Sequence, residues 1–412
     1  MKLNQKTVAI IGQGYVGLPL AMAAAQAGWR VIGVDIDETK IQLLNSGSSF
    51  IEDVIDYELQ NAINNGLYAA TSNISEVNKA DVIIICVPTP LNKNKEPDLY
   101  ALRSAVESIA PHVKNETLII SESTSYPGTL RNEIIPLFEQ NRKKVDLNTY
   151  FAVSPERVNP GDKEWNQKNT PRLIGGINKE SEIRAIKFYE TFCNSITLVD
   201  TPEIAEAAKL LENTFRLVNI GFINEFAQLC NASDIEINKV IDAASTKPYG
   251  FMTFRPGIGI GGHCIPVDPL YLTWWAKTKE SKTPIVELTE KTNSEMYKYI
   301  WDRAKKIIRE EKAQFRILLL GVAYKSGLSD TRETPAKSLY SYLIELGHEV
   351  AWIDPLVKSW EGIPQANNVK NFDVAILTIN QAGLPIDQLL NEQTPILDCT
   401  NTYSKKEGIQ SL

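Results

Sequence analysis

The sequence lacks the long apolar runs and the positive charge that are typical of membrane and nucleic-acid-binding proteins. No stretch reaches the roughly 18 apolar residues that a transmembrane helix needs. The start, MKLNQKTVAIIGQGYVG, has no small-residue cleavage site, so we expect neither a signal peptide nor an anchor. A net charge of -7 disfavours contact with nucleic acid or a membrane surface, although a local basic pocket for an anionic ligand is compatible with it.

Cysteines are few, and their spacing does not indicate that any two of them form a pair. The five, Cys86, Cys193, Cys230, Cys264 and Cys399, lie far apart and form no C-x-x-C motif. An odd number at such spacing indicates neither a disulfide framework nor a structural zinc site. We therefore expect a protein of the reducing cytoplasm that holds no metal.

The first 200 residues alternate between apolar strand patterns and helical patterns. Hydrophobic residues make up 43% of the chain and charged residues 23%, close to the globular average, and the length of 412 residues suggests two or three domains. The alternation predicts an α/β fold with a doubly wound parallel sheet. The predicted strands are 6–12, 29–35, 81–88, 117–123 and 150–156.

Three glycines at the first strand-to-helix turn indicate a dinucleotide site. Gly12, Gly14 and Gly17 have the spacing G-x-G-x-x-G between the first predicted strand and an alanine-rich helix, which is the context that this fingerprint requires. Gly12 permits the tight turn, Gly14 lets the backbone approach a pyrophosphate, and Gly17 lets the helix pack closely. A tight turn without a ligand is the alternative.

Acidic residues at the end of the second predicted strand favour NAD over NADP. Asp35 follows this strand and can accept hydrogen bonds from both ribose hydroxyls. A 2′-phosphate would meet Asp35, Asp37 and Glu38 and be repelled.

Polar residues follow the third, fourth and fifth predicted strands. They are Thr89, Thr124 and Glu156. Because parallel strands end at one edge of a sheet, where ligands bind, we expect these three residues to surround one crevice. Each is also a common turn or cap residue, which is the alternative.

A long helix is predicted to begin at Thr201, an N-cap candidate followed by proline, and to run for about 28 residues or about 40 Å. Lys209 and Asn213 lie one turn apart on one side of it, with Arg216 and Asn224 further along. A solvated face is the alternative to a functional ammonium and amide pair. We favour the pair because the flanking apolar residues are expected to be buried: Leu210, Leu211, Phe215, Leu217, Val218 and Ile220.

The C-terminal third repeats the pattern of the first domain. Residues 346–354, LGHEVAWID, resemble 27–35, AGWRVIGVD, and predict a second Rossmann-like unit over roughly 301–412. Its other elements are expected at 315–324, 334–346, 373–379 and 395–400.

The first turn of this second unit is predicted to lack the glycine fingerprint. In YKSGLSDTRETP, Lys325 and Arg332 stand where the glycines would be, and their charges can bind a pyrophosphate. Salt bridges to Asp330 or Glu333 are the alternative. Two nucleotide-like sites on one chain predict a cofactor and a nucleotide-bearing substrate.

The stretch PGIGIGGHCIPVDP also fits G-x-G-x-x-G, through Gly257, Gly259 and Gly262. Prolines before and after these glycines predict that no helix follows, so we interpret the match as false for a phosphate loop. Neighbouring side chains of an extended chain point to opposite sides, so His263 and Cys264 are expected to face different partners. We predict a glycine-rich loop that carries Cys264 to a substrate.

A series of motifs, in order along nearly the whole chain, resembles the UDP-glucose/GDP-mannose dehydrogenase family. They are GQGYVGLPLA (12–21), CVPTP (86–90), ESTSYPGT (122–129), SPERVNPG (154–161), KLLEN (209–213), GGHCIPVDP (261–269) and DTRETP (330–335). The cysteine motif resembles the branch that oxidises UDP-N-acetylhexosamines. CVPTPLNKNKEPDL and SESTSYPGT are most similar to UDP-N-acetylglucosamine 6-dehydrogenases, with UDP-N-acetylmannosamine enzymes close.

The resemblance implies an NAD-dependent enzyme that oxidises the C6 alcohol of a UDP-sugar to a carboxylate, for surface polysaccharide precursors. The aldehyde formed first cannot lose a second hydride until a nucleophile adds to it, and a thiolate suits that step. Cys264 matches the family nucleophile, and Lys209 with Asn213 matches the pair that stabilises an oxyanion. The other catalytic residues implied are Asp268, for proton transfer and hydrolysis, and Thr124 and Glu156, for holding or activating water.

The resemblance also implies two sets of binding residues and a domain plan. The cofactor set is Gly12, Gly14, Tyr15, Val16, Gly17, Asp35, Lys40, Pro88, Thr89, Ser123, Thr124 and Arg332. The substrate set is Glu156, Arg157, Lys209, Asn213, Arg216, Gly259, Gly262, His263 and Lys325, with Arg157 at the acetamido group or a phosphate. We expect an NAD-binding domain (1–200), a central helical domain with the cysteine loop (201–300), a UDP-sugar-binding domain (301–412), and a homodimer or higher homo-oligomer.

Two other functions compete with this one. A β-hydroxyacid dehydrogenase also joins a Rossmann domain to a K-x-x-x-N helix, but it removes one hydride and needs no thiol. A non-enzymatic NAD-binding protein would need none of Cys264, Lys209 and Asn213. Among nucleotide sugars, UDP-N-acetylmannosamine and UDP-glucose are the alternatives to UDP-N-acetylglucosamine.

Overall fold

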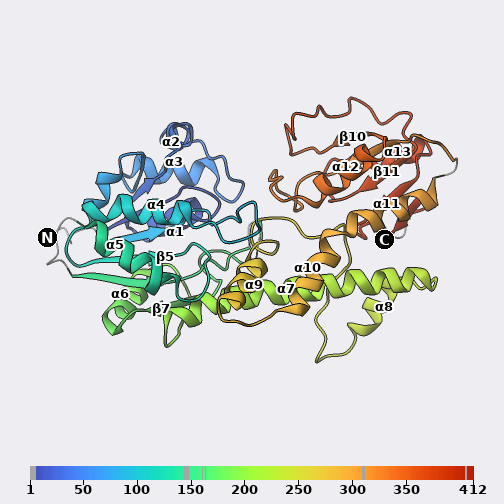
Figure 1. Cartoon of the computed structure of the whole chain (residues 1–412). Coiled ribbons are helices and arrows are strands. Elements are labelled where there is room, and N and C mark those ends of the chain that lie inside the picture. Colours follow the sequence, from blue (N-terminus) through green and yellow to red (C-terminus); the bar gives the residue numbers. More distant parts are fainter. Residues whose placement is uncertain (1–5, 143–147, 160, 163, 309–310, 404–405) are drawn as a thin grey trace. The chain divides into compact units, whose positions relative to one another are not determined.

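The computed structural model describes residues 6–142, 148–159, 161–162, 164–308, 311–403 and 406–412. The chain divides into two compact units, one of Met1–Glu212 with Leu270–Thr278 and one of Asn213–Pro269 with Lys279–Leu412. Each unit contains a mainly parallel sheet with helices, so the α/β prediction is confirmed (Figure 1). Helix α7 (Pro202–Ala232) supplies residues to both units.

The sheet of the first unit has the strand order β3-β2-β1-β4-β5-β6-β7-β8. The strands are β1 (Thr7–Ile11), β2 (Arg30–Val34), β3 (Tyr68–Thr71), β4 (Val82–Ile85), β5 (Thr117–Ser121), β6 (Thr149–Val153), β7 (Arg172–Gly176) and β8 (Ile196–Leu198). All five strands predicted for this region are present. They pair in parallel as expected, whereas β7, a strand that was not predicted, runs antiparallel to β6.

Helices of the first unit bury the apolar strands on both faces, which is why these strands are continuous hydrophobic runs. They are α1 (Gly17–Gln26), α2 (Glu38–Asn45), α3 (Asp56–Asn64), α4 (Tyr100–Ile109), α5 (Ile135–Asn141) and α6 (Lys179–Tyr189), with the shorter η1 (Ile74–Lys79), η2 (Ala110–His112) and the π-helical turn η3 (Leu130–Ile134). One core cluster joins α1 and α3 to β1, β2 and β4.

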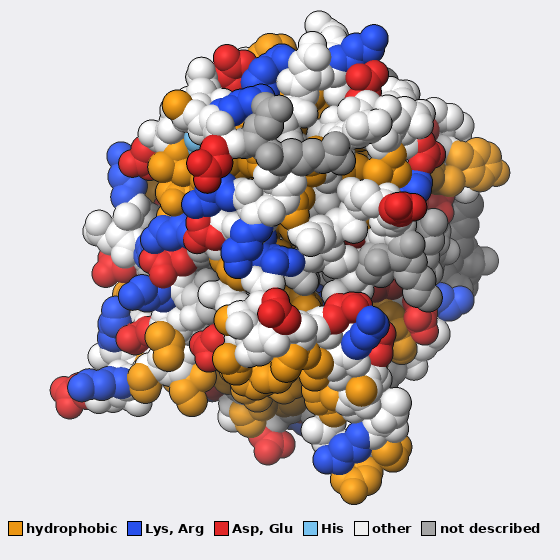
Figure 2. Space-filling view, turned by 90° about the vertical axis from the view of Figure 1, so that its right-hand side faces the viewer, with side chains coloured by type: hydrophobic (Ala, Val, Ile, Leu, Met, Phe, Trp, Pro, Cys, Tyr) orange, Lys and Arg blue, Asp and Glu red, His pale blue; other side chains and the backbone are white. Residues whose placement is uncertain are grey.

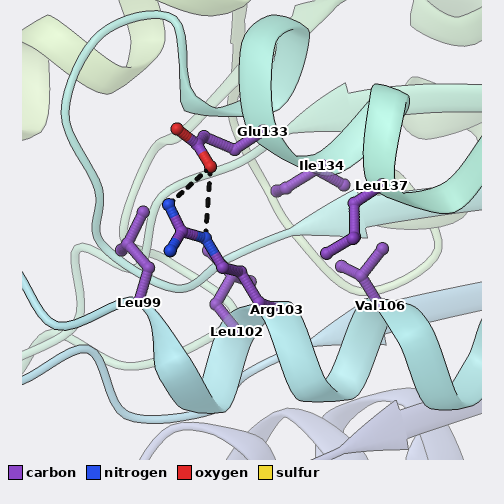
Figure 3. A pocket seen from close by; sticks show the side chains of 7 residues that line it. All are labelled: Leu99, Leu102, Arg103, Val106, Glu133, Ile134 and Leu137. Atoms are coloured by element: carbon purple, nitrogen blue, oxygen red, sulfur yellow. Dashed lines mark hydrogen bonds and ion pairs between the residues drawn. The ribbon is translucent and has the colours of Figure 1, made fainter.

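Helix α4 anchors the segment that follows the ESTSYPGT motif. Leu102 and Val106 of α4 face Ile134 of η3 across a small apolar gap (Figure 3). At the rim of this gap Arg103 pairs with Glu133, with 2.8 Å between Nη2 and the carboxylate. The helical turn that begins directly after the motif is therefore held by packing and by an ion pair.

The second unit has a five-stranded sheet of order β10-β9-β11-β12-β13, all parallel. Its strands are β9 (Arg316–Leu320), β10 (Glu349–Ile353), β11 (Val374–Leu377), β12 (Ile396–Asp398) and β13 (Ile409–Ser411). Alternate residues of β9 enter different cores: Ile317 and Leu319 join one cluster, and Leu318 and Leu320 join the other. Both faces are thus buried, as the RILLL run requires.

Three helices of the second unit lie between α7 and its sheet: α8 (Ile237–Ala244), α10 (Pro284–Ser294) and α11 (Met296–Ile307). Two more, α12 (Pro335–Glu345) and α13 (Ile386–Asn391), follow the first strand of the sheet. Helix α9 (Asp268–Thr278) begins in this unit and continues in the first. None of the helices in the described part of the chain has the length and apolar character to cross a membrane.

The internal repeat extends further than the sequence indicated. Gly321, like Gly12, follows the first strand with a positive φ, and its amide donates to the end of the neighbouring strand in the same way. Asp354, like Asp35, accepts a backbone N–H from the turn after the first strand, at 2.8 Å in both units. The expectation that this turn has lost its glycines was therefore wrong for the first of them.

Helix α7 spans the predicted segment, but its surface differs from the prediction. Lys209, Asn213 and Asn224 are buried, whereas Arg216 is exposed. Leu211 and Phe215 were expected to be buried, yet they are 68% and 46% exposed. The polar stripe is therefore largely internal, and part of the apolar stripe faces outward.

The glycine within α7 is explained by close packing of α10. A Cβ on Gly221 would lie 2.1 Å from the γ-methyl carbon of Thr289, and the next nearest atoms of Thr289 would lie 3.4 Å away. We expect Gly221→Ala to lower the free energy of unfolding by about 1–3 kcal/mol through this overlap. In Gly221→Ala/Thr289→Ala the overlap is absent and alanine favours the helix by about 1 kcal/mol, so stability should recover.

Denaturant midpoints of both variants and of Thr289→Ala measure this effect. A single Gly221→Ala variant as stable as the wild-type protein would contradict the packing explanation.

Candidate active site

The turn between β1 and α1 has room for a ligand at one glycine and none at the other two. A Cβ on Gly12 would lie 2.6 Å from the carbonyl oxygen of Cys86, and one on Gly17 would lie 1.8 Å from that of Gly12. A Cβ on Gly14 would meet no heavy atom within 4 Å. Bare backbone with open space before it at the N-terminus of α1 suits a pyrophosphate.

Asp35 lies at the end of β2, next to this turn. Its carboxylate accepts the backbone N–H groups of Gln13 at 2.8 Å and Asp37 at 3.0 Å, and Lys40 Nζ lies 3.9 Å from it. Asp37 caps α2 by accepting from Thr39 and Lys40. These bonds fix the carboxylate in one orientation and leave it acceptor capacity for a diol.

The loops after β4 and β5 bind each other, as expected for neighbouring strand ends. The hydroxyl of Thr89 donates to the carbonyl of Thr124 at 2.7 Å, and that of Ser123 donates to Val87 at 2.7 Å. Tyr271 of α9 donates to the carbonyl of Thr89 at 3.0 Å. Thr89 and Thr124 therefore share one edge of the sheet, next to an exposed Pro88.

Glu156 follows β6 and is buried, with all of its carboxylate oxygens engaged. One oxygen accepts the backbone N–H groups of Arg157 and Val158, and the other accepts from Gln167 and Arg172. Burial alone would raise the pKa of this carboxyl, but Arg172 and these hydrogen bonds lower it. The group is thus held as a carboxylate whose lone pairs are already used.

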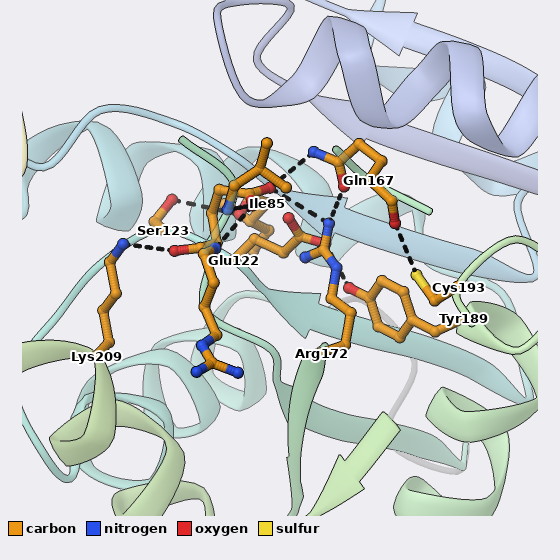
Figure 4. A network of polar contacts seen from close by, with 11 residues as sticks. Ile85, Glu122, Ser123, Gln167, Arg172, Tyr189, Cys193 and Lys209 are labelled. Carbon is orange, nitrogen blue, oxygen red and sulfur yellow. Dashed lines mark hydrogen bonds and ion pairs between the residues drawn. The ribbon is translucent and has the colours of Figure 1, made fainter. Parts of the chain in front are cut away.

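Lys209 of α7 reaches the same segment. Its Nζ donates to the backbone carbonyl of Glu156 at 2.5 Å, and the side chain is almost wholly buried (Figure 4). One turn of helix further on, Glu212 binds Arg157 with a bidentate ion pair, 2.7 Å at its shorter contact. Arg157 also donates to the carbonyl of Pro171, so the chain itself occupies much of this guanidinium. Pro160, within the same motif, lies outside the described residues.

A second carboxylate of α7 holds the ESTSYPGT segment. Glu206 is buried and accepts the backbone N–H groups of Gly128 at 2.5 Å and Leu130 at 2.9 Å. Burial raises its pKa to about 7, and the two hydrogen bonds oppose that rise. Glu206 and Lys209 together fix α7 against the segments that carry Thr124 and Glu156.

In the second unit, Asn213, Asp268 and Cys264 are linked. Asn213 Nδ2 donates to the carboxylate of Asp268 at 2.5 Å, and the amide of Asp268 donates to the carbonyl of Cys264 at 2.8 Å. Asp268 is the first residue of α9, so the expectation that no helix follows the cysteine loop was wrong. Proline in a first helical turn costs no hydrogen bond, which is why Pro269 does not prevent this helix.

The glycines of the cysteine loop permit close packing within the second unit. A Cβ on Gly261 or Gly262 would lie within 2.8 Å of Tyr324, and Gly259 and Gly262 have positive φ. Asn224 of α7 accepts the amide of Gly257 at 2.9 Å. Packing therefore accounts for Gly261 and Gly262.

Exposed side chains complete the loop. His263 and Cys264 are both exposed, in a bend where the chain is not extended, so the strand geometry assumed for this pair was wrong. All five cysteines lie in the described part of the chain, and none forms a disulfide.

Arg332 forms the ion pair that was the alternative to phosphate binding. Its guanidinium contacts the buried carboxylate of Asp330, with 2.6 Å at the shortest distance. Lys325 is partly buried. Within the described ranges no group of three or more His, Cys, Asp or Glu side chains is placed to hold a metal ion.

The predicted residues thus fall into two groups, one in each unit, and sequence patterns missed several of their supports. Arg172 and Glu206 lie in none of the motifs, and Glu122, the first residue of ESTSYPGT, was assigned no role, because each acts through partners distant in the sequence. Burial of their charged groups is the signal that identifies them, and only the structure shows it.

Three segments match one family. Residues 6–193 match the NAD binding domain of the UDP-glucose/GDP-mannose dehydrogenase family, residues 203–295 its central domain and residues 318–405 its UDP binding domain. The chain belongs to the UDP-glucose/GDP-mannose dehydrogenase family. It is an NAD-dependent nucleotide-sugar dehydrogenase, and the room at Gly14 and the carboxylate of Asp35 fit the cofactor.

Relatives in this family carry two substrate names. A UDP-N-acetyl-D-mannosamine dehydrogenase of Methanococcus aeolicus is 37% identical over 86% of this chain and 79% of its own. A UDP-N-acetyl-D-glucosamine 6-dehydrogenase of Pseudomonas aeruginosa is 34% identical over 85% and 83%. The solved structure of a UDP-D-ManNAc dehydrogenase from Pyrococcus horikoshii has a TM-score of 0.86 at 31% identity and covers 96% of this chain and 95% of its own.

A 3-hydroxyisobutyrate dehydrogenase from Mycobacterium tuberculosis matches as well, with a TM-score of 0.53 at 17% identity over 72% of this chain and 94% of its own. That likeness concerns the fold alone.

For this dehydrogenase, the two neighbouring glycines of the fingerprint predict different outcomes on substitution. Gly14→Ala adds a methyl group to open space, so folding should be unaffected while NAD binding weakens by about 1–3 kcal/mol, because the cofactor must move aside. Gly17→Ala places the methyl against the Gly12 carbonyl and should destabilise the fold by about 3 kcal/mol. Calorimetric titration with NAD and thermal unfolding separate the two effects, and equal melting temperatures for both variants would contradict this assignment.

Proposed function

We propose that the protein oxidises C6 of a UDP-N-acetylhexosamine to the uronic acid, as a precursor of surface polysaccharide. The observation that carries this proposal is the linked set of Asn213, Asp268 and Cys264 in the second unit, together with the buried Lys209 four residues before Asn213 on α7. A dehydrogenase that removes one hydride has no use for a thiol on such a loop.

The overall change is a four-electron oxidation: the alcohol and one water give the carboxylate, two hydrides and three protons. NAD, when bound, supplies the hydride acceptor for each of the two oxidations. Between them, the thiolate of Cys264 adds to the C6 aldehyde and forms a hemithioacetal, whose oxidation leaves a thioester on the sulfur. Water then opens the thioester, and the thiol is restored as the acid departs.

Lys209 and Asn213 stabilise the oxyanion of the tetrahedral adducts in this proposal. Their positions at i and i+4 on α7 direct an ammonium and an amide to the same side of the helix, and each good donor of this kind contributes about 3–4 kcal/mol. Asp268 assists proton transfer and hydrolysis. Its bond to Asn213 keeps the amide nitrogen, the donor, toward the carboxylate and fixes both side chains.

Thr124 is proposed to hold the water. The same role was expected of Glu156, but its carboxylate already accepts four hydrogen bonds, so we propose that it fixes its own segment and the carbonyl that Lys209 binds. We propose that Arg157 also supports this segment, because it forms a bidentate pair with Glu212, and that it contacts the substrate as well. The three-part division at residues 200 and 300 stays a proposal, supported by the start of α7 at Pro202.

The choice of sugar rests on two kinds of support. The motifs CVPTPLNKNKEPDL and SESTSYPGT favour UDP-N-acetylglucosamine. The names of several relatives, such as the Methanococcus aeolicus dehydrogenase, favour its C2 epimer, UDP-N-acetylmannosamine. We propose the first as substrate and keep the second as the specific alternative.

The purified protein should form two NADH for each sugar oxidised, and its rate should be highest with UDP-N-acetylglucosamine. Side-by-side assays with UDP-N-acetylglucosamine, UDP-N-acetylmannosamine, UDP-N-acetylgalactosamine and UDP-glucose test both points. Cys264→Ala should yield no uronic acid, while Cys230→Ala, a buried cysteine of the same unit, should stay active. One NADH per sugar, or full conversion by Cys264→Ala, would sink the thioester mechanism.

We also propose that the enzyme is a homodimer that buries the outer stripe of α7. Phe215, Phe222 and Leu229 recur every seven residues on this helix and are 46%, 62% and 61% exposed. Figure 2 shows hydrophobic side chains gathered near the lower end of one face. A contiguous stripe of exposed apolar side chains is typical of a surface that a partner covers.

Phe222→Glu should therefore halve the mass measured by light scattering. Tyr57→Glu, at an aromatic side chain of α3 that is 74% exposed, is the control. A wild-type protein that is monomeric at all concentrations would refute the dimer.

A further inference from the structure

The antiparallel strand β7 begins with a buried arginine at the functional edge of the first sheet. The pairing of β6 with β7 sets Ala152 opposite Gly176 and Val153 opposite Gly175. Three residues further along this register, Glu156 comes opposite Arg172. In a parallel strand the first residue would lie at the other edge of the sheet, so the one antiparallel pairing is what brings Arg172 to the active-site edge.

Arg172 is 2% exposed and lies between two carboxylates. Its Nη1 is 3.0 Å from Glu122, which follows β5, and its Nη2 is 3.3 Å from Glu156, which follows β6. Nη2 also donates to the amide oxygen of Gln167, and the guanidinium lies over the ring of Tyr189 at 5.0 Å (Figure 4). A planar fork of donors can bind both carboxylates at once, which an ammonium cannot do.

Burial of these three charged groups costs free energy, and filling the core does not require them. Two carboxylates and one guanidinium lose their hydration here, and Glu122 keeps an oxygen with no hydrogen bond in the described structure. Burial raises the pKa of Glu122 to about 7, against the opposing effect of Arg172. An apolar core at this place would cost less free energy to bury. The buried charges therefore indicate a functional role at the segment that carries Glu156.

We propose that Arg172 is a positioning residue for the oxidation, because it fixes the Glu156 segment so that its carbonyl receives the Lys209 ammonium. This inference rests on the proposed role of Lys209 at the oxyanion. Arg172 touches neither Lys209 nor the reacting atoms. Arg172 is connected to Lys209 through Glu156. Arg172 binds the carboxylate of Glu156, and Lys209 binds the backbone carbonyl of the same residue at 2.5 Å.

The test compares Arg172→Met/Glu122→Gln with Glu122→Gln alone. Arg172→Met by itself leaves two buried carboxylates without the cation that lies between them and is expected to fold poorly. The double variant removes one charge of each sign, and Glu156 keeps Gln167 and its two backbone donors. It should therefore fold with a melting temperature close to that of Glu122→Gln.

In the double variant kcat should fall by roughly 100-fold, the effect of a displacement of about 1 Å at a reacting group, with KM little changed. Arg172→Lys, which can reach one carboxylate, should recover part of kcat. The acid limb of the kcat profile should move to higher pH, because Arg172 lowers the pKa of Glu156. The titratable groups that face Arg172 are Glu122, Glu156, Tyr189 and Cys193, and Glu122→Gln controls for the first of them.

Crystal structures of both variants give a readout that does not depend on turnover. The bond between Lys209 Nζ and the Glu156 carbonyl should persist in Glu122→Gln and be broken in the double variant. An intact bond, or a kcat within about twofold of that of Glu122→Gln, would overturn the positioning role. Absence of NADH formation by the wild-type protein with every sugar would instead reject the proposed function, and the crystal structures would still decide the role of Arg172.

Discussion

A buried ammonium needs a hydrogen-bond acceptor, and the one that Lys209 finds, the backbone carbonyl of Glu156, ties α7 to the first unit. Other polar side chains of the same helix make bonds of the same kind. Glu206 accepts from the segment after ESTSYPGT, and Glu212 pairs with Arg157. In the second unit Asn213 binds Asp268. Within each unit, side chains of α7 thus fix loops that have no regular structure of their own, and such support is what a site of precise geometry needs.

The two units share the same kind of turn after the first strand of their sheets, but the turn has a different role in each. In both, a glycine with positive φ follows the first strand, and an aspartate after the second strand accepts a backbone N–H from that turn. The first unit keeps Gly14 with open space before it. In the second unit Ala323 stands two residues after Gly321, where Gly14 stands after Gly12, and Gly261 and Gly262 of the cysteine loop pack against the next residue, Tyr324. The same turn therefore leaves open space before Gly14 in one unit and packs against the cysteine loop in the other, which agrees with the rule that sites are built onto folds.

Local patterns were sufficient for most of the fold. Both sheets, the long helix and the dinucleotide turn follow from periodicity, glycine spacing and helix-start signals, each of which depends on neighbours in sequence. The failures have physical causes of longer range. The strand β7 and its direction depend on a pairing across the sheet, and the helix after the cysteine loop begins at Asp268, directly before a proline that the breaker rule treats as a stop. Exposure of Leu211 and Phe215 depends on which face of α7 is covered, and periodicity alone does not define that face.

The sequence by itself determined the chemistry available: a dinucleotide turn, an ammonium and amide one helical turn apart, and a thiol on a glycine-rich loop. These are properties of residue type and short spacing, which survive without coordinates. The tertiary structure decided which charges are buried together. It engaged the Glu156 carboxylate in four hydrogen bonds and brought Arg172 to the active-site edge, between Glu122 and Glu156. Burial multiplies the strength of such contacts, and it is set by segments far apart in the chain, so no local pattern records it.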